Sequence, residues 1–203
     1  MPEISPSENL SIPLLVSTRN LHKVDEIRAI LGSHFTVFDL SSVPSVPVVE
    51  ETGSTFEDNA TLKAIAASLA FEGWVIADDS GLEVDALKGA PGVYSARYAG
   101  EDSTDALNNR KLLAEIAGSA DRSARFRCVI VLARAGRKLA AFSGTVEGHI
   151  LEEPMGEGGF GYDPLFVPQG FTESFGQLPS DVKNSLSHRS RALQKLRDWK
   201  GWF

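Results

Sequence analysis

The chain of 203 residues is poor in cysteine and has no excess of positive charge. Cys128 is the only cysteine, so no disulfide can form within the chain, and its apolar neighbours favour a buried structural thiol over a nucleophile. The formal net charge of −7 argues against a protein that coats nucleic acid. A small anionic ligand remains compatible with this charge, because a metal ion and a few lysines can reverse the local field.

Long apolar runs are also absent. No run approaches the ~20 residues that a membrane-spanning helix needs, and the first dozen residues lack the basic and apolar regions of a signal peptide. We therefore expect a cytoplasmic protein with no membrane partner. Residues 1–12 are interpreted as a flexible leader, and residues 13–203 as a single domain with a sizeable core.

Two adjacent aspartates form the most informative feature of the chain. An apolar run over residues 74–77 ends in Asp78 and Asp79, and Ser80 follows. Adjacent carboxylates repel one another unless a cation or a proton intervenes, and ligand sites favour the ends of strands. The pattern predicts a strand that ends here and delivers both acids to the rim of a sheet, where Mg²⁺ would bind. A loop with solvated aspartates is the alternative.

The first strand and helix enclose a polar turn. Residues 12–17 predict a strand and residues 24–31 an amphipathic helix, with Thr18, Asn20 and Lys23 between them. Such a turn presents backbone N–H groups and the helix dipole to an anion. It is not a Walker A loop, because the glycines of that motif are missing. A capped helix with surface polar residues is the alternative reading.

Acidic pairs flank the second predicted helix, which runs from an N-cap at Thr55 to about Glu72. Glu50 and Glu51 precede it and the aspartate pair follows it, so the four acids are candidates for a metal cradle. Arg97 is a candidate partner for these acids or for a phosphate, and an ordinary ion pair is equally compatible.

Residues 124–135 and 138–150 alternate in polarity and predict a hairpin joined at residues 136–137. We expect no catalytic residues in this hairpin, only sheet.

A glycine-rich segment follows the hairpin. Four of the six residues from Gly156 to Gly161 are glycines. This arrangement is entropically costly unless a ligand or another backbone approaches closely. Phe160 and Tyr162 lie beside them and are predicted to offer flat faces on which a base can stack. A flexible turn with packed aromatic residues is the alternative.

The tail contains the last candidate residues. Ser187 is a predicted N-cap, which places His188 and Arg189 in the first turn of the last helix. Cations are disfavoured at this end of a helix unless an anion or an acceptor is bound there, so the pair marks a candidate site.

Together these segments resemble the inosine triphosphate pyrophosphatase family, the Ham1-like pyrophosphatases of non-standard purine nucleotides. The matching pieces are T-x-N-x-x-K at 18–23, EETGSTFEDNA at 50–60, ADDSGLEVDALKGAPGVYSARYAG at 77–100, GGFGYDPLF at 158–166 and KNSLSHR at 183–189. The resemblance implies an elongated α/β fold, a mixed sheet flanked by helices, with two lobes and a central active-site cleft. It also implies a homodimer and Mg²⁺-dependent hydrolysis of ITP, dITP and XTP to the monophosphate and pyrophosphate.

The resemblance also implies roles for individual residues. Asp79 matches the proton acceptor and a metal ligand, Glu51 matches a second metal ligand, and Asp78 and Glu50 are helpers. The residues that match substrate contacts are Thr18, Asn20, Lys23, Ser80, Phe160, Gly161, Tyr162, Asp163, Lys183, His188 and Arg189.

Base selectivity has a physical expectation. Donors from Arg189 or His188 that face the 6-keto oxygen of hypoxanthine would meet an amino group in ATP, and sites of this kind discriminate by about 10⁴ or more. Two other functions stay open: a pyrophosphatase for other modified nucleotides, and a non-catalytic nucleotide-binding module. A nucleic-acid partner is not expected.

Overall fold

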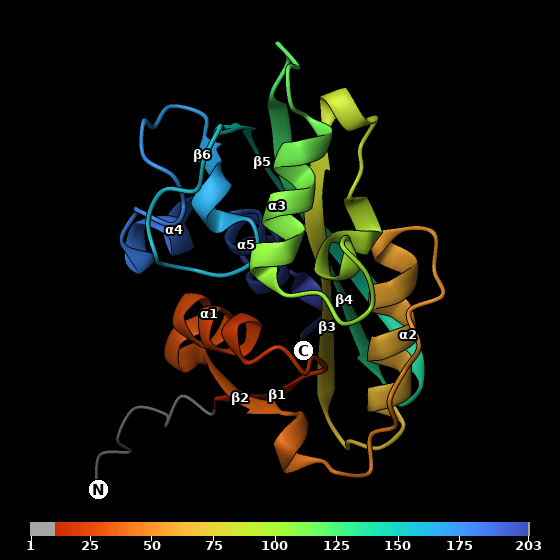
Figure 1. The fold of residues 1–203 in the computed structure, drawn as a ribbon. Coiled ribbons are helices and arrows are strands. Elements are labelled where there is room, and N and C mark those ends of the chain that lie inside the picture. The colour runs from red at the N-terminus through yellow and green to blue at the C-terminus, as the bar shows by residue number, and fades with distance from the viewer. Residues whose placement is uncertain (1–10, 203) are drawn as a thin grey trace, which may run out of the picture.

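A mixed six-stranded sheet, with strand order β2-β1-β3-β4-β5-β6, forms the centre of the computed structural model, which describes residues 11–202 (Figure 1). The strands are β1 (Ile12–Val16), β2 (Phe35–Asp39), β3 (Trp74–Val84), β4 (Ser123–Arg134), β5 (Arg137–Ile150) and β6 (Phe166–Pro168). β1 pairs in parallel with β2 and β3, and the remaining pairs are antiparallel. The predicted α/β class with a mixed sheet is confirmed. The division into two lobes stays a prediction.

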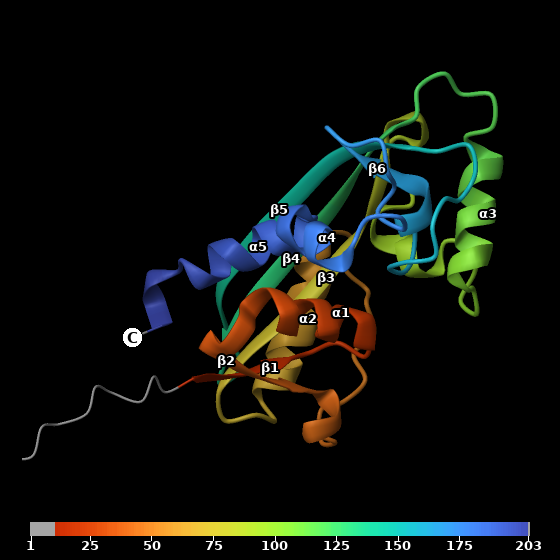
Figure 2. The ribbon, with the colours of Figure 1, turned by 90° about the vertical axis from the view of Figure 1, so that its left-hand side faces the viewer.

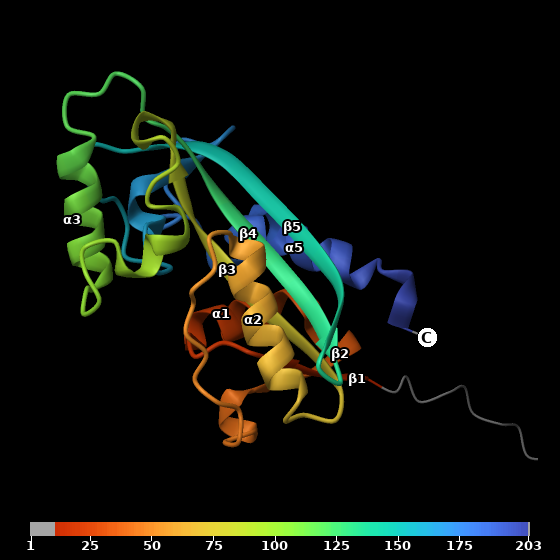
Figure 3. The same cartoon turned by 90° about the vertical axis from the view of Figure 1, so that its right-hand side faces the viewer.

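Helices cover both faces of this sheet. They are α1 (Leu21–Leu31), α2 (Phe56–Ser68), α3 (Asp105–Glu115), α4 (Ser180–Leu186) and α5 (His188–Arg197). α1 and α5 lie on one face and α2 on the other, as the two side views show (Figures 2 and 3). No helix of residues 11–202 is long and apolar enough to cross a membrane. Residues 1–10 of the predicted leader lie outside the described residues, and Ile12 already belongs to β1.

Side-chain caps fix where the helices begin. Asn20, Thr55, Thr104 and Ser187 each accept a hydrogen bond from the backbone N–H three residues later. The caps predicted at Thr55 and Ser187 are therefore confirmed. α2 ends at Ser68, earlier than the predicted Glu72.

The predicted end of the strand before Asp78 is wrong. β3 continues to Val84 and pairs with β4 over ten consecutive residues, from Val75 to Val84. The apolar run ends where it does because the neighbour on the other side ends there: β1 pairs with β3 only as far as Ile76. The two aspartates thus lie inside a strand, just beyond the end of β1, and successive side chains point to opposite faces of the sheet.

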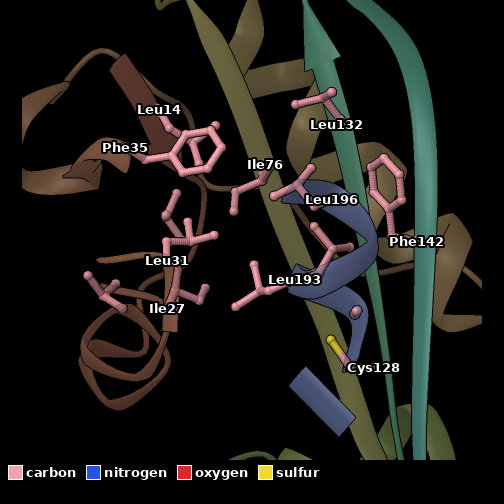
Figure 4. Close-up of a cluster of buried hydrophobic side chains, with 14 of the residues drawn as sticks. Leu14, Ile27, Leu31, Phe35, Ile76, Cys128, Leu132, Phe142, Leu193 and Leu196 are labelled. Atoms are coloured by element: carbon pink, nitrogen blue, oxygen red, sulfur yellow. The ribbon is translucent and has the colours of Figure 1, made fainter. Parts of the chain in front are cut away.

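A large apolar core seats α1 and α5 on the sheet. Leu193 and Leu196 of α5 pack with Ile76, Leu132 and Phe142 (Figure 4). Complete burial of each of these leucines contributes roughly 1.5–3 kcal/mol.

The backbones of α5 and β5 meet directly at Gly144. A Cβ on this residue would contact the His188 carbonyl oxygen and would lie 2.7 Å from the Ala192 nitrogen. This close approach fixes the N-terminus of α5, and with it His188 and Arg189.

On the opposite face, α2 packs through small residues. Ala60 and Ala64 lie against Ala77, Val129 and Val131. The small side chains bring the helix close to β3, so its polar residues Asn59 and Lys63 reach the strand.

The predicted hairpin of β4 and β5 is confirmed, with its turn at Ala135 and Gly136, one residue earlier than expected. Both turn residues have positive φ, +50° and +73°, as a two-residue hairpin turn requires.

Candidate active site

The predicted site residues converge on one pocket of about 290 Å³. It lies among the N-terminus of α1, the middle of β3, the glycine-rich segment and the N-terminus of α5. Its lining includes every residue predicted for catalysis, substrate and metal: Thr18, Asn20, Lys23, Glu51, Asp79, Ser80, Phe160, Gly161, Tyr162, Asp163, Lys183, His188 and Arg189. A more open depression of about 660 Å³ beside the N-terminus of α2 contains none of them.

Asp78 points to the face of α1 and α5 and is fully buried. Its carboxylate accepts hydrogen bonds from Lys23 Nζ at 2.6 Å, Arg189 Nε at 2.9 Å, Ser80 Oγ at 2.9 Å and Cys128 Sγ at 3.0 Å. Burial alone would raise its pKa, but the Arg189 and Lys23 cations hold that pKa well below its usual range. These donors occupy both carboxylate oxygens. Asp78 therefore holds the Lys23 and Arg189 cations in place and does not assist in binding a metal ion.

Asp79 points to the face of α2. It accepts hydrogen bonds from Asn59 Nδ2 and Lys63 Nζ, both at 3.2 Å. Burial raises its pKa, and the attraction of Lys63 and Lys23 does not fully offset this effect. Asp79 therefore binds a proton more readily than an ordinary aspartate does.

Lys63 joins the acids on this face. Its ammonium donates to Glu51 Oε1 at 2.7 Å, to the Asp78 carbonyl oxygen at 3.0 Å and to Asp79. Arg97 lies 3.6 Å from the other oxygen of Glu51. Each aspartate thus has its own lysine, so repulsion between the neighbours is relieved without a shared cation.

Two carboxylates of the pocket, Glu51 and Asp79, have the ligand chemistry that Mg²⁺ prefers. Within the described range 11–202, no group of three or more His, Cys, Asp and Glu side chains could hold a metal. Glu51 and Asp79 nevertheless contact one ammonium, so their hard oxygens face a common region of the pocket. Mg²⁺ commonly takes one or two carboxylates and fills its shell with phosphate oxygens and water. Glu50 is exposed and lies outside the pocket lining.

The glycine-rich segment presents Phe160 to the pocket. The Lys183 ammonium lies 4.9 Å from the centre of this ring, and the His22 imidazole stacks on it at 5.4 Å between centres. Asp163 accepts from the Phe160 N–H at 2.8 Å and from Lys183 Nζ at 2.5 Å. Phe160 thus lies in the pocket with its ring beside His22 and the Lys183 ammonium.

The neighbouring Tyr162 does not match its predicted stacking role. Only 3% of the residue is exposed, its ring belongs to an apolar cluster, and its hydroxyl donates to the Ser95 carbonyl oxygen at 2.9 Å. Because the phenol is packed and its hydroxyl has a hydrogen-bond partner, Tyr162 anchors the segment. Asp163 is equally buried and acts through Phe160 and Lys183.

The basic residues of the tail are fixed by Glu26 of α1. Glu26 accepts from Lys183 Nζ at 2.7 Å and from Arg189 Nη1 at 2.5 Å. Burial opposes the ionised form of Glu26, but the two cations lower its pKa. Of the two residues predicted at the N-terminus of α5, Arg189 is thus stabilised as a cation by Glu26 of α1 and by the buried Asp78 of β3.

His188 is a buried neutral base. Burial and the nearby Arg189 lower its pKa well below the usual range, and the ring stacks on Phe126 of β4 at 4.8 Å between centres. Its Nδ1 atom is buried without a hydrogen-bond partner in the described part of the chain. The β4–β5 hairpin, predicted only as sheet, also contributes to the site, because Phe126 lines the pocket and Cys128 contacts Asp78.

Comparison with known proteins places this site in a family. The model of the Ham1 family matches residues 14–199. The chain belongs to the Ham1 family.

Individual relatives agree over nearly the whole chain. A protein of Geobacter sulfurreducens named dITP/XTP pyrophosphatase is 50% identical over 192 residues, which cover 93% of this chain and 96% of the relative. The Ham1 protein of Staphylococcus aureus superposes with a TM-score of 0.82 at 42% identity and covers 92% of this chain and 96% of its own. The Ham1 protein of Coxiella burnetii gives 0.83 at 39% identity, with 92% and 97% covered.

Several residues of this Ham1 site were not predicted from the sequence, among them Glu26, Lys63, Phe126 and Cys128. Lys63 and Glu26 had a local signal, because Lys63 follows Asn59 of the second family motif by one helical turn and Glu26 follows the predicted contact Lys23 in the same way. Phe126 and Cys128 had none, since alternation in a strand assigns a residue to a face of the sheet but does not identify what covers that face.

Proposed function

We propose that this chain hydrolyses the non-standard purine nucleoside triphosphates ITP, dITP and XTP to the monophosphate and pyrophosphate, with Mg²⁺ as cofactor. One observation carries the proposal: three features line the same pocket. They are Asp79, whose pKa is raised by burial, the N-terminus of α1, which can bind a phosphate, and the aromatic ring of Phe160. The name of the Geobacter sulfurreducens relative supports the same activity.

The triphosphate is assigned to the N-terminus of α1. Thr18 and Asn20 line the pocket there, and Asn20 caps the helix while the dipole favours negative charge. Lys23 lies one turn in and is held by Asp78, so its ammonium is ordered before the substrate arrives. A cation fixed in this way loses less conformational entropy on binding than a free lysine does.

Asp79 is assigned the role of general base. A water in line with the α-phosphorus would give its proton to this carboxylate while pyrophosphate leaves. The raised pKa makes Asp79 a stronger base than a solvated aspartate. Glu51 and Asp79 would hold Mg²⁺, which when bound neutralises the triphosphate and stabilises charge on the departing oxygens.

The base is assigned to Phe160, His188 and Arg189. Arg189 donates from Nε and Nη2 to Asp78, from Nη2 to Ser80 and from Nη1 to Glu26. A guanidinium has five N–H groups, so an N–H of Nη1 is left without a partner in residues 11–202. A rigid donor of this kind suits a 6-keto oxygen and penalises the 6-amino group of ATP.

The decisive experiment measures pyrophosphate release from ITP, dITP, XTP, GTP and ATP, each with Mg²⁺ and with EDTA. We expect Mg²⁺-dependent release from the first three and little from ATP. Release from modified pyrimidine nucleotides instead would favour a different house-cleaning pyrophosphatase. Tight nucleotide binding with no release would favour a non-catalytic module.

The proposal also includes a homodimer in the cytoplasm. Light scattering coupled to size-exclusion chromatography is expected to give twice the mass of the chain, and cell fractionation should recover the protein with soluble cytoplasmic enzymes. A single-chain mass or recovery in another fraction would refute the corresponding part.

A further inference from the structure

Both main-chain polar groups of Gly161, the last glycine of the glycine-rich segment, form hydrogen bonds with side chains of α3. Asp105 Oδ2 accepts from the Gly161 N–H at 2.7 Å, and Asn109 Nδ2 donates to the Gly161 carbonyl oxygen at 3.0 Å. Asp105 and Asn109 are one helical turn apart, so they project from the same face of α3. One face of the helix thus bonds both polar groups of a single residue.

These hydrogen bonds matter because the backbone of a glycine has more conformational freedom than that of any other residue. Its φ of +63° lies in the left-handed region, which glycine enters at little cost and leaves as easily. Phe160, which forms the aromatic face of the pocket, precedes it directly. A rotation of the Gly161 backbone would therefore move the ring against which the base is proposed to lie.

The chemistry of the two α3 residues favours a role at the site over packing. Only 7% of Asn109 is exposed, and its Oδ1 atom is buried without a partner in residues 11–202, a cost that an apolar residue would avoid. Asp105 lines the pocket and brings a negative charge toward an anionic substrate. The unpartnered Oδ1 of Asn109 and the negative charge of Asp105 are both unfavourable. They are explained if the site needs a hydrogen-bond acceptor at position 105 and a donor at position 109 to hold Gly161.

We propose that Asp105 and Asn109 are positioning residues for the base side of the active site: together they fix the Gly161 peptide and thereby the ring of Phe160. The inference rests on the proposed hydrolysis of inosine and xanthosine triphosphates. It adds a specific demand, namely an acceptor at position 105 and a donor at position 109.

The test compares four single variants with the wild type. Asp105→Ala and Asn109→Ala should each raise the KM for ITP by about tenfold. Asp105→Asn should restore most of the loss, because an amide oxygen also accepts. Asn109→Asp should behave like Asn109→Ala, because a carboxylate cannot donate. The double alanine variant should lose less than the product of the single effects, because both residues act on one peptide.

Two further readouts separate positioning from a general structural role. Inhibition by inorganic triphosphate, which lacks a base, should be unchanged in all variants, whereas the affinity for IMP in calorimetry should fall with the KM effect. Melting curves identify any variant that fails to fold. If an alanine variant does so, the KM values of Asp105→Asn and Asn109→Asp test the inference in its place.

Three results would overturn the inference. Asp105→Ala could bind ITP more tightly, as removal of a repelling charge predicts, or triphosphate inhibition could weaken as much as IMP binding does. Wild-type protein that neither hydrolyses ITP nor binds IMP would remove both this inference and the proposed function. Wild-type protein that binds IMP without hydrolysis would refute the proposed function alone, and the IMP affinities of the variants would then decide the inference.

Discussion

Asp78 and Asp79 follow one another in β3, yet their carboxylates lie on opposite faces of the sheet and in opposite electrostatic surroundings. Asp78 is enclosed by Lys23 and Arg189, which keep its pKa low. Asp79 has Lys63, shares it with Glu51, and keeps a raised pKa. The same residue type is therefore a fixed anion at one position and a candidate base at the next.

The contrast follows from strand geometry. In a helix or a loop, two neighbouring acids would share their surroundings, and a common cation would be the simplest way to stabilise both. In a strand their side chains diverge, so each acquires the helices of its own face: α1 and α5 for Asp78, α2 for Asp79.

The largest effect should come from Asp79→Asn. If Asp79 is the general base, turnover of ITP should fall by about 10²–10⁴ while the protein stays folded. Steady-state kinetics and circular dichroism check this result. Glu83→Gln is a matched control in the same strand and on the same face, and its turnover should be nearly unchanged. Turnover above a tenth of wild type in Asp79→Asn would break the assignment.

Asp78→Asn should mainly affect stability. The substitution leaves the buried Arg189 and Lys23 cations without their central anion, and loss of one member of a buried ion pair costs about 3–5 kcal/mol. Urea denaturation measures the change. Since the pKa of Asp78 is lowered on folding, its contribution is present above the ordinary carboxyl pKa of about 3.9 and is lost as the pH falls through the folded value. The variant should lack this acid-dependent part.

Lys63→Met should sharpen the difference between the two acids. Removal of the ammonium takes away the largest attraction that offsets the burial of Asp79, so its already raised pKa should rise further. Because the base must be ionised, the acid limb of kcat/KM should move to higher pH. An unchanged acid limb would show that another group controls it.

The smallest effect is expected at Cys128, on the Asp78 side. Cys128→Ala removes one weak donor to Asp78 and should cost about 1 kcal/mol of stability. Cys128→Ser restores a donor and should recover part of it. If alanine lowered kcat with stability unchanged, the thiol would have a direct catalytic role instead.

Local signals made much of this molecule predictable. The caps at Thr55 and Ser187 and the β4–β5 hairpin depend on neighbours within a few residues, and all three were expected from the sequence. Every residue predicted for catalysis, substrate and metal also lines the pocket, because the motifs of a known family mark these residues.

What could not be predicted depends on contacts between distant parts of the chain. Asp78 meets Arg189 across 111 positions and Cys128 across 50. The pattern at Ala77 indicated a strand end because the residues change there from apolar to acidic, although only the pairing with β1 stops and the pairing with β4 continues. Tyr162 was expected to face a ligand, and only the position of Ser95 shows that its hydroxyl is satisfied inside the protein.

The uninterrupted pairing of β3 with β4 has a consequence for how this gene can vary. The register shift in the hairpin lies between β4 and β5 at Leu132 and Ala133, beyond the Ile130 that pairs with Asp78. Insertion or deletion of one residue between Trp74 and Asp78 would exchange the faces of both aspartates and separate each from its lysine. A substitution therefore alters one side chain of the site, whereas a single-codon insertion or deletion would displace both acids at once.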